Sequence, residues 1–296
     1  MKKIFTVISD HDNMRVDRWL RKNSYNYPQS LLEKLLRSGK IKVNEKKVKS
    51  SFKVKTNFKI QVFNLNFNKT LDKNKFKPDN KTIEKYENGI IFDCDEYIVI
   101  NKLPGIPVQG GTKSRRNLID IFKKSRYFKY TQPYTVHRLD KDTSGIFLIA
   151  KNRKSAQFFT SLFRLRKIYK TYLAICHGEI SKHKGILENN LEKFEKNKKI
   201  LEKAITSFKV IDRNNNFSLL EMKPITGRKH QLRKQCSLIG HPICGDNKYN
   251  KIKISQKNLM LHSYSIKFKI NNNKLNYIAP LPNHFKNFLD KKKLYI

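Results

Sequence analysis

The amino-acid sequence predicts an α+β protein, in which a small α+β domain precedes a larger, mixed and mainly β domain. Short apolar runs separated by turn residues recur through residues 87–296, which is typical of strands. Two amphipathic segments among them predict helices. Hydrophobic residues make up 38% of the 296 residues, so a chain of this length can bury a substantial core.

The smaller domain is expected at residues 1–64, where two short helices and a strand follow one another. Residues 15–23 and 28–39 predict the helices, and residues 40–44 predict the strand. Four leucines in the second helix recur at helical spacing and form an apolar stripe: Leu31, Leu32, Leu35 and Leu36.

Both ends of the second helix carry signals. Ser30 can cap its start, with Glu33 three residues later completing a capping box. Gly39 can take the left-handed conformation that ends a helix. We therefore expect a helix with defined boundaries.

The same segment presents cations on its polar face: Arg15, Arg18, Arg21, Lys34, Arg37 and Lys40. Cations close to backbone amides suit phosphate contacts. A solvated helical face would show the same pattern, and the pattern alone does not decide between the two.

A linker is expected at residues 65–86, because residues 64–82 are polar, rich in Asn and Lys, and without a sustained period. Beyond it, the apolar runs 90–92 and 97–100 predict a hairpin. Further strands are expected at 146–150, 172–176, 204–211, 217–221 and 265–270, and helices at 152–167 and 230–240. Strands of this spacing also fit a sandwich, so the spacing does not determine the topology.

The charge balance points to a polyanionic partner. Lys and Arg number 64 against 24 Asp and Glu, which gives a formal net charge of +40 at pH 7. A positive potential of this size attracts nucleic acid. An AT-rich genome would also enrich the chain in Lys, so the charge indicates nucleic acid without proving it.

The remaining composition excludes several classes of protein. The cysteines at 94, 176, 236 and 244 are scattered and form no CxxC pair, which argues against disulfides and a zinc site and fits a reducing compartment. No run approaches the roughly 20 apolar residues of a membrane span. We expect a cytoplasmic protein that does not associate with membranes.

The stretch HRLDKDTSG at 137–145 carries most of the functional signal. It places a polar, charged run directly before the apolar run 146–150, where charged groups need partners. Arg138 and Asp140 are therefore candidates for a hydrogen-bonded ion pair in a loop that presents a carboxylate at the end of a strand. On composition alone, a purely structural Arg–Asp turn is the more frequent explanation.

A second cluster, TGRKHQLR at 226–233, gathers hydrogen-bond donors after a turn that Gly227 permits: Arg228, His230, Gln231 and Arg233. Such an array at the start of a helix suits a phosphate-rich ligand, although a basic helix face would look the same. His230, His241 and Cys244 lack the compact spacing of a metal site.

These motifs together resemble a known family. HRLDKDTSG closely resembles the signature of the large-subunit ribosomal RNA pseudouridine synthases of the RluA superfamily. Further matches follow in the family's order: NKLPG at 101–105, KIYKTYLA at 167–174, ITGRKHQLR at 225–233 with GHPICGD at 240–246, and LMLHSYSIKF at 259–268. The matches span residues 87–268. In NKLPG the sequence departs from the family, because Leu103 stands between Lys102 and Pro104, where the family commonly has Pro directly after Lys.

The first segment is also similar to a family component. Residues 1–64 resemble the S-four-type RNA-binding domain that precedes the catalytic domain in many members. This segment and VQGG at 108–111 are most similar to the RluC branch. The resemblance implies a mainly antiparallel β catalytic domain of the pseudouridine synthase type at 87–296. It also implies a monomeric enzyme whose partner is large-subunit ribosomal RNA, free or in an assembling particle.

The resemblance further implies the reaction. The enzyme breaks the bond between uracil and ribose carbon 1′, turns the ring and joins its carbon 5 to the sugar, with no cofactor and no metal. Asp140 is the catalytic carboxylate, which acts on the anomeric carbon or takes a neighbouring sugar proton. Arg138 or Arg233 supplies the cation that keeps it ionised.

The remaining roles follow from the same match. Tyr172 packs on the target base and takes the carbon-5 proton, and Leu261 lies on the pocket floor. The uridine must be flipped out of its stack, and cations on the flanking phosphates would offset the loss of stacking. The expected RNA-binding residues are His137, Arg228, His230, Gln231, Leu261, Arg15, Arg18 and Arg37.

Two other functions fit parts of the sequence. A non-catalytic RNA-binding factor of ribosome assembly would use the two-helix segment and the basic surface, but it would not need Asp140 and Tyr172 in their motifs. A hydrolytic glycosidase would normally carry a second acid in a matching motif, and the sequence shows none.

Overall fold

The computed structural model divides the chain into two compact units, Met1–Lys75 and Phe76–Ile296. The structure describes residues 2–23, 27–63, 76–110, 116–195, 198–214, 216–250 and 258–296. The first half of the expected linker 65–86, residues 65–75, lies outside the described residues. Its last part belongs to the second unit, because helix α3 (Asn80–Glu87) buries Tyr86 in an apolar cluster of that unit. The second unit therefore begins earlier than the predicted boundary at residue 87.

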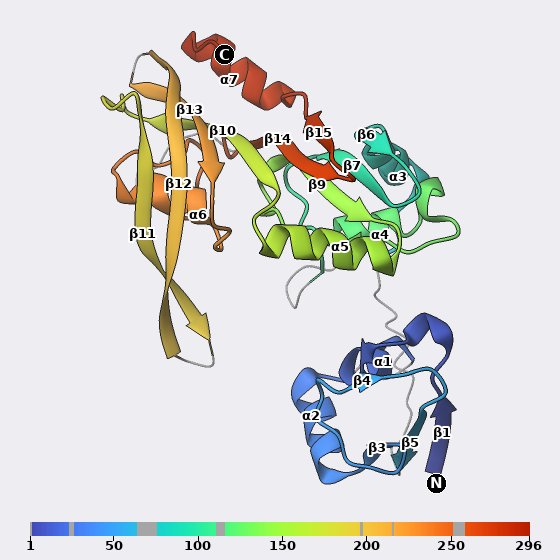
Figure 1. Cartoon of the computed structure of the whole chain (residues 1–296). Helices are drawn as coiled ribbons and strands as arrows, with labels where there is room; N and C mark the ends of the chain where they lie inside the picture. Colours follow the sequence, from blue (N-terminus) through green and yellow to red (C-terminus); the bar gives the residue numbers. More distant parts are fainter. Residues whose placement is uncertain are drawn as a thin grey trace. The chain divides into compact units, whose positions relative to one another are not determined.

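The first unit packs two helices with short strands (Figure 1). Its elements are β1 (Lys2–Thr6), the short 3₁₀ helix η1 (Ser9–His11), β2 (Met14–Arg15), α1 (Val16–Lys22), α2 (Gln29–Ser38), β3 (Ile41–Val43), β4 (Lys53–Val54) and β5 (Lys59–Phe63). The strands form an antiparallel sheet in the order β1-β5-β3, and β2 pairs with β4. The two predicted helices and the predicted strand are confirmed.

Helix α2 ends as predicted but begins differently. Gly39 has φ of 78° and ends the helix in the left-handed conformation. Pro28 is the residue before the first turn, and its carbonyl accepts from the amides of Leu31 and Leu32. Ser30 therefore lies inside the helix, and the predicted capping box is wrong. Leu31 is also exposed, whereas the other three leucines of the stripe are buried.

The second unit is built on one sheet of ten strands, ordered β11-β12-β13-β10-β14-β9-β7-β6, with β15 on β14 and β8 on β9. The strands are β6 (Ile90–Asp93), β7 (Tyr97–Lys102), β8 (Tyr134–Thr135), β9 (Ser144–Ala150), β10 (Tyr169–His177), β11 (Lys184–Glu195), β12 (Lys198–Asn214), β13 (Phe217–Pro224), β14 (Leu261–Ile270) and β15 (Asn273–Ile278). All pairs are antiparallel except β14 with β9. The mainly antiparallel α+β fold is confirmed, and a sandwich is excluded because the strands form one sheet.

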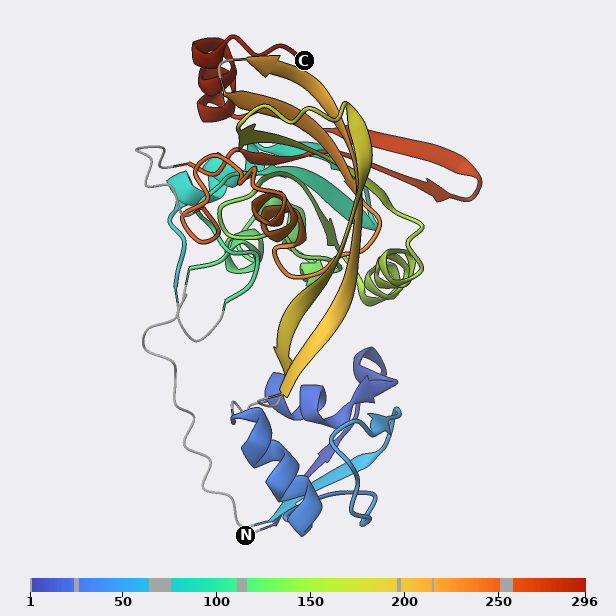
Figure 2. The same cartoon turned by 90° about the vertical axis from the view of Figure 1, so that its left-hand side faces the viewer.

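The Lys-rich residues 184–195 and 198–203 form part of a long hairpin. Strands β11 and β12 project as a two-stranded ribbon beyond their neighbours (Figures 1 and 2). Ion pairs cross this ribbon, with Lys199 Nζ 2.5 Å from Glu192 and Lys203 Nζ 2.5 Å from Glu188. These ion pairs neutralise part of the lysine charge of the hairpin.

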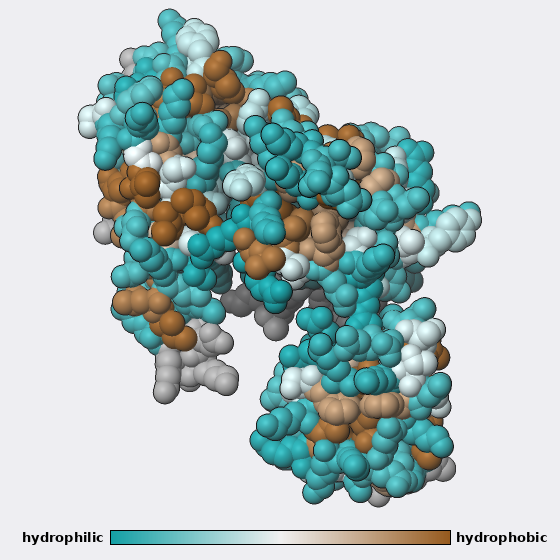
Figure 3. Space-filling model, viewed as in Figure 1, coloured by the Kyte–Doolittle hydropathy of each residue, from teal (hydrophilic) through white to brown (hydrophobic). Residues whose placement is uncertain are grey.

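Helices accompany the sheet: α3, α4 (Leu118–Phe122), α5 (Arg153–Arg164), α6 (Gln231–Leu238), α7 (Asn283–Lys292) and the short 3₁₀ helix η2 (Arg126–Phe128). The two predicted helices correspond to α5 and α6, and the amide of Ser155 donates to the Asn152 side chain at the start of α5. No helix in the described part of the chain combines the length and the apolar run that crossing a membrane requires. Hydrophilic residues cover most of the face of each unit that Figure 3 shows.

Candidate active site

Asp140 lies in the loop between β8 and β9, at the edge of a large cleft in the second unit. The cleft has a volume of about 1470 Å³ and is lined from β10, β12, β13 and α6 as well as from this loop. The Asp140 side chain is 16% exposed, so its carboxylate reaches the cleft without being fully solvated. The structure thus brings the predicted carboxylate into a cavity large enough for a nucleotide.

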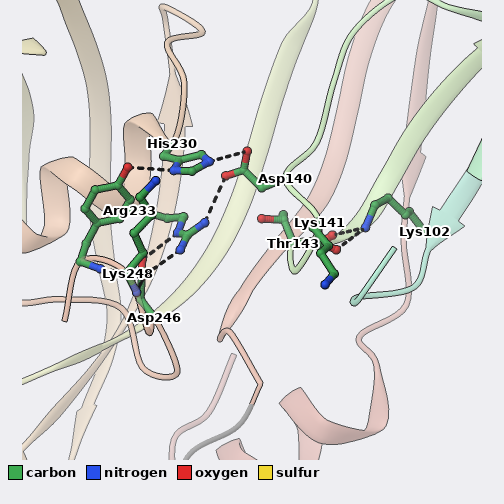
Figure 4. Close-up of polar contacts among 9 residues, drawn as sticks. Lys102, Asp140, Lys141, Thr143, His230, Arg233, Asp246 and Lys248 are labelled. Carbon is green, nitrogen blue, oxygen red and sulfur yellow. Dashed lines mark hydrogen bonds and ion pairs between the residues drawn. The ribbon is translucent and has the colours of Figure 1, made fainter. Parts of the chain in front are cut away.

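Two nitrogens of the TGRKHQLR cluster face this carboxylate (Figure 4). His230 Nε2 lies 3.6 Å from Asp140 Oδ1, and Arg233 Nη1 lies 3.7 Å from Oδ2. Both distances exceed that of a hydrogen bond, so the carboxylate oxygens are not tied down by these groups. The sequence left open whether Arg138 or Arg233 supplies the cation, and the geometry favours Arg233.

The predicted pair of Arg138 with Asp140 does not form among the described residues. The Arg138 side chain is exposed and lines the same cleft. The turn between residues 138 and 140 points the two side chains to different surroundings, because Leu139 between them is buried in an apolar cluster. Arg138 is therefore a solvated cation at the cleft.

Arg233 is held by a buried carboxylate that the sequence analysis did not single out. Its Nε and Nη2 each donate to Asp246 at 2.7 Å, which is bidentate geometry. Asp246 is fully buried and also accepts from the amides of Lys248 and Tyr249 at 2.9 and 3.1 Å. The only sequence signal was its place at the end of GHPICGD.

Electrostatics keep this pair ionised. Burial opposes the charge of Asp246, but the hydrogen bonds and charge of Arg233 outweigh burial and lower the pKa of Asp246. Burial likewise opposes the charge of Arg233, and Asp246 outweighs it and raises the pKa of Arg233. Arg233 therefore presents a permanent positive charge to Asp140.

His230 is fixed by its backbone and by a tyrosine. It has φ of 54°, the left-handed region, directly before α6, and its Nδ1 is 2.8 Å from the Tyr249 hydroxyl. The Tyr249 ring also lies 5.3 Å from the Arg233 guanidinium carbon. Burial lowers the pKa of His230, the charge of Asp140 opposes that effect, and the charge of Arg233 adds to it. His230 is thus mostly neutral at pH 7.

The loop of Asp140 is held from its other side by a lysine in NKLPG (Figure 4). Lys102 is fully buried at the end of β7, and its ammonium donates to the carbonyls of Leu103, Lys141 and Thr143 at 2.9, 3.0 and 2.8 Å. Burial lowers the pKa of Lys102 to about 7, against the opposing charges of Asp142 and Asp140. Leu103, the departure from the family's pattern, contributes one carbonyl of this cage.

The closing glycine of HRLDKDTSG permits close contact between β9 and β14. Gly145 has φ of +104°, and a Cβ at this position would lie 2.2 Å from the Ser263 carbonyl oxygen. Next to it, Ser144 Oγ is 2.8 Å from His262 Nδ1, while His262 Nε2 lies 3.3 Å from the Ala279 carbonyl. Burial lowers the pKa of His262 to about 4, so this histidine is neutral and structural.

Tyr172 and Leu261 lie where the sequence predicts them. Both line the cleft, on β10 and at the start of β14. Burial raises the pKa of Tyr172 to about 12, with Ser263 opposing and the charge of Asp140 adding to the rise. Tyr172 is therefore a protonated phenol near the carboxylate. Leu261 is 3% exposed and supplies an apolar surface.

The expected RNA-binding residues of this unit differ in how far the protein itself already occupies their hydrogen-bonding groups. The Gln231 amide is buried and spends its hydrogen bonds inside the protein, on Thr226, Ile205, Thr206 and the amide of Arg228. Gln231 also lines the cleft, and its side-chain amide is bonded within the protein. Arg228 lines the cleft and is anchored to the Lys203 carbonyl and to Glu202.

His137 lines the cleft but is held by packing. Its ring centroid is 4.5 Å from those of Phe147 and Phe163, and its Nε2 accepts from the Leu148 amide at 2.9 Å. Burial and the charge of Lys170 lower its pKa to about 3. His137 is neutral, and because Nε2 accepts, its ring proton is on Nδ1.

The candidate residues of the first unit also differ. Arg18 and Arg37 are exposed. Arg15 donates to Asp17 from Nε and Nη2 at 3.1 and 2.6 Å, so its guanidinium is already paired.

The cleft as a whole is strongly cationic. Twelve lysines and arginines line it, against the carboxylates of Asp140, Glu192 and Glu202. Glu192 pairs with Lys199 and Glu202 with Arg228. No group of three or more metal-ligating side chains is found in the described residues. The cationic lining suits a phosphate-rich ligand.

Comparisons with known proteins agree with this geometry. The RNA pseudouridylate synthase family matches residues 96–238, and the S4 domain matches residues 14–57. A ribosomal large subunit pseudouridine synthase C of Buchnera aphidicola is 33% identical, over 97% of this chain and 96% of that protein. One of Rickettsia felis is 35% identical, over 92% and 94%. The structure of human RNA Pseudouridylate Synthase Domain Containing 4 aligns with a TM-score of 0.64 at 25% identity, over 73% of this chain and 97% of that one.

Proposed function

This chain belongs to the RNA pseudouridylate synthase family, and from that premise we propose that it isomerises specific uridines of large-subunit (23S) ribosomal RNA to pseudouridine. The relatives named above are ribosomal large subunit pseudouridine synthases, which supports this substrate and the RluC-type branch. The observation that carries the proposal is the position of Asp140 in a cationic cleft that Tyr172 also lines, with Arg233 Nη1 3.7 Å from its carboxylate.

Asp140 is the catalytic residue in this proposal. Its oxygens make no short hydrogen bond to His230 or Arg233, so they are available to the ribose of a bound uridine. The carboxylate attacks carbon 1′ or removes a neighbouring sugar proton, and either route breaks the bond from carbon 1′ to nitrogen 1 of uracil. The ring then turns and its carbon 5 bonds to carbon 1′. In the first route this bond displaces the Asp140 carboxylate from carbon 1′, and in the second route Asp140 returns the proton to carbon 2′. Carbon 5 loses a proton and nitrogen 1 gains one, so the product is an isomer of the substrate.

Tyr172 and Leu261 would hold the base. Tyr172 presents an aromatic ring and a protonated hydroxyl to the cleft, which suits packing on a pyrimidine and a part in the transfer of the carbon-5 proton. A uridine inside a stack cannot reach this position, so it must be flipped out. Arg138, Arg228 and the other cations of the cleft would bind the flanking phosphates and offset the lost stacking.

The first unit would add affinity for RNA. It matches the S4 domain over residues 14–57, and Arg18 and Arg37 are exposed there. We propose that the enzyme acts as a monomer. We place the enzyme in the cytoplasm, acting on ribosomal RNA that is free or in an assembling particle.

Release of tritium from RNA labelled at carbon 5 of uridine tests the proposal. We expect Asp140→Asn to abolish release, since the change removes the charge with little change of shape, and to leave RNA binding largely intact. Asp142→Asn is the matched control, because Asp142 is an exposed carboxylate two residues away, and we expect it to retain turnover. No release by folded wild-type protein would favour a non-catalytic assembly factor, and turnover by Asp140→Asn would reject the assigned role.

A further inference from the structure

Lys170 is a cation inside the active-site cleft that the proposed mechanism does not use. It lies on β10 two residues before Tyr172, and both residues line the cleft. Lys170 and Tyr172 therefore line the cleft from one strand, and the pairing of β10 with β14 shifts register between Thr171 and Tyr172. Lys170 is half-buried, and no ion pair of Lys170 is found among the residues that the structure describes.

None of the cleft-lining carboxylates that the structure describes pairs with Lys170. Asp140 faces His230 and Arg233, Glu192 pairs with Lys199, and Glu202 pairs with Arg228. A partly desolvated ammonium without a counter-ion is unfavourable, and burial accordingly lowers the pKa of Lys170. An anionic group of a ligand would compensate the charge of Lys170.

A second donor lines the same cleft as Lys170. This donor is His137, whose pKa is lowered by burial and by the charge of Lys170. The Leu148 amide occupies His137 Nε2, so the Nδ1–H group is the donor that this ring can offer a ligand. An ammonium and a neutral imidazole N–H together suit the oxygens of a phosphate.

We propose that Lys170 and the Nδ1–H of His137 form a subsite for one phosphate of the RNA backbone that adjoins the flipped uridine. This inference rests on the proposed function. Two residues of a strand span about 6.6 Å, so a phosphate at Lys170 adjoins a nucleotide whose base packs on Tyr172. The contact holds the backbone at a fixed distance from Asp140, and Lys170 is thus a positioning residue.

A scan of neutral phosphates locates the contact. The probe is a short RNA containing a uridine that the wild-type enzyme converts, made as a series with one methylphosphonate at each position. Binding is measured in the Asp140→Asn background, which prevents turnover. We expect one neutral phosphate next to the target to weaken binding by about 10-fold to 100-fold, the usual range for a charge-assisted hydrogen bond.

Repeating the scan with Lys170→Met tests whether Lys170 is the residue that binds the sensitive phosphate. We expect this variant to bind unmodified RNA about as weakly as the parent binds the sensitive methylphosphonate RNA, and to lose its sensitivity at that position alone. Its binding constant should depend less steeply on salt, by about 0.7 in the log–log slope for one single-strand phosphate. In the enzyme that retains Asp140, Lys170→Met should raise KM more than it lowers kcat.

Lys269→Met is the matched control, because Lys269 is an exposed lysine on the neighbouring strand β14 and does not line the cleft. It should keep the sensitivity of the parent at every position. If Lys170→Met does not fold, the same measurement is made with Lys170→Gln. An unchanged methylphosphonate profile in the Lys170 variant would overturn the subsite. Failure of the proposed function is distinguishable, since wild-type protein would then form no pseudouridine at all.

Discussion

Asp246→Asn should destabilise the second unit and weaken catalysis through one cause, the loss of the buried partner of Arg233. The Asp246 side chain has no exposed surface, that of Arg233 is 8% exposed, and two hydrogen bonds of 2.7 Å join them. Asparagine keeps the shape but carries no charge and offers one acceptor oxygen in place of two. The Arg233 guanidinium then remains buried with an incomplete partner.

The size of the effect follows from this burial. Removing one partner of a buried ion pair lowers the free energy of unfolding by about 3–5 kcal/mol. In a unit of this size each kcal/mol shifts Tm by about 2–4 °C, so we expect Tm to fall by roughly 6–20 °C. Calorimetry and tritium release measure the two effects on the same preparation. Turnover should fall while the protein is still folded, because Arg233 is no longer aligned with Asp140.

The effect should also depend on pH with a defined sign. The folded protein lowers the pKa of Asp246, so the carboxylate stabilises the fold above its unfolded pKa of about 3.9 and loses this effect as the pH falls through the lower, folded pKa. The difference in unfolding free energy between wild type and Asp246→Asn should be constant from pH 5 to pH 8 and shrink below about pH 4.

Two comparisons separate this cause from general damage. Asp290→Asn changes an exposed carboxylate on α7 and should leave Tm unchanged. The double change Arg233→Met with Asp246→Leu removes both charges, and it should recover stability without recovering turnover. If Asp246→Asn unfolds within about 0.5 kcal/mol of wild type, a magnitude typical of neutral surface changes, the reasoning is refuted.

Two further variants probe the loop of Asp140. Lys102→Met should remove the cage donor of three carbonyls and lower turnover. The folded pKa of Lys102, about 7, lies below its unfolded value, so the unfolded chain binds more protons between pH 7 and pH 10 and the free energy of unfolding of wild type should rise over that interval. Lys102→Met should abolish this rise. Parallel pH profiles of the two proteins in denaturant titrations would contradict this. Gly145→Ala should lower the free energy of unfolding by more than about 2 kcal/mol, because its Cβ would lie 2.2 Å from the Ser263 carbonyl at a φ of +104°. Gly227→Ala, with open space around its Cβ, should show no loss, and equal melting temperatures for the two alanine variants would reject the close contact.

The helices were predictable because the apolar periodicity and the capping residues that define a helix lie within its own sequence. Periodicity placed α1, α2, α5 and α6, and the left-handed Gly39 ended α2 as expected. The predicted capping box was wrong because the helix begins after Pro28, whose carbonyl accepts from the first turn. The residue types alone do not show which of the two possible starting positions is preferred. The predicted strands are all present, but their order could not be read, because pairing partners lie far apart in the chain and many registers bury similar apolar faces.

The site was predictable only in part for the same reason. Asp140, Tyr172 and Arg233 stand in motifs, and the cleft gathers all three. Arg138 was the nearer cation in sequence, but proximity along a turn does not fix the direction of a side chain, and the facing cation comes from 93 positions further along. Asp246 and Lys102 were missed because a buried charged residue can be recognised only from the groups that it contacts. Those contacts are known only from the assembled sheet.

The order of the sheet explains why the site lies where it does. Asp140 belongs to the part formed by β7 and β9, whereas His230 and Arg233 belong to the part formed by β10, β12, β13 and α6. The two parts join through β14, whose parallel pairing with β9 consists of His262 with Ser144 and Ser263 with Gly145, directly after the Asp140 loop. The carboxylate and its facing cations therefore come from different parts of one sheet, which the pairing of β14 with β9 joins. It follows that a change at the junction should impair catalysis before either part unfolds, since each part keeps its own apolar core.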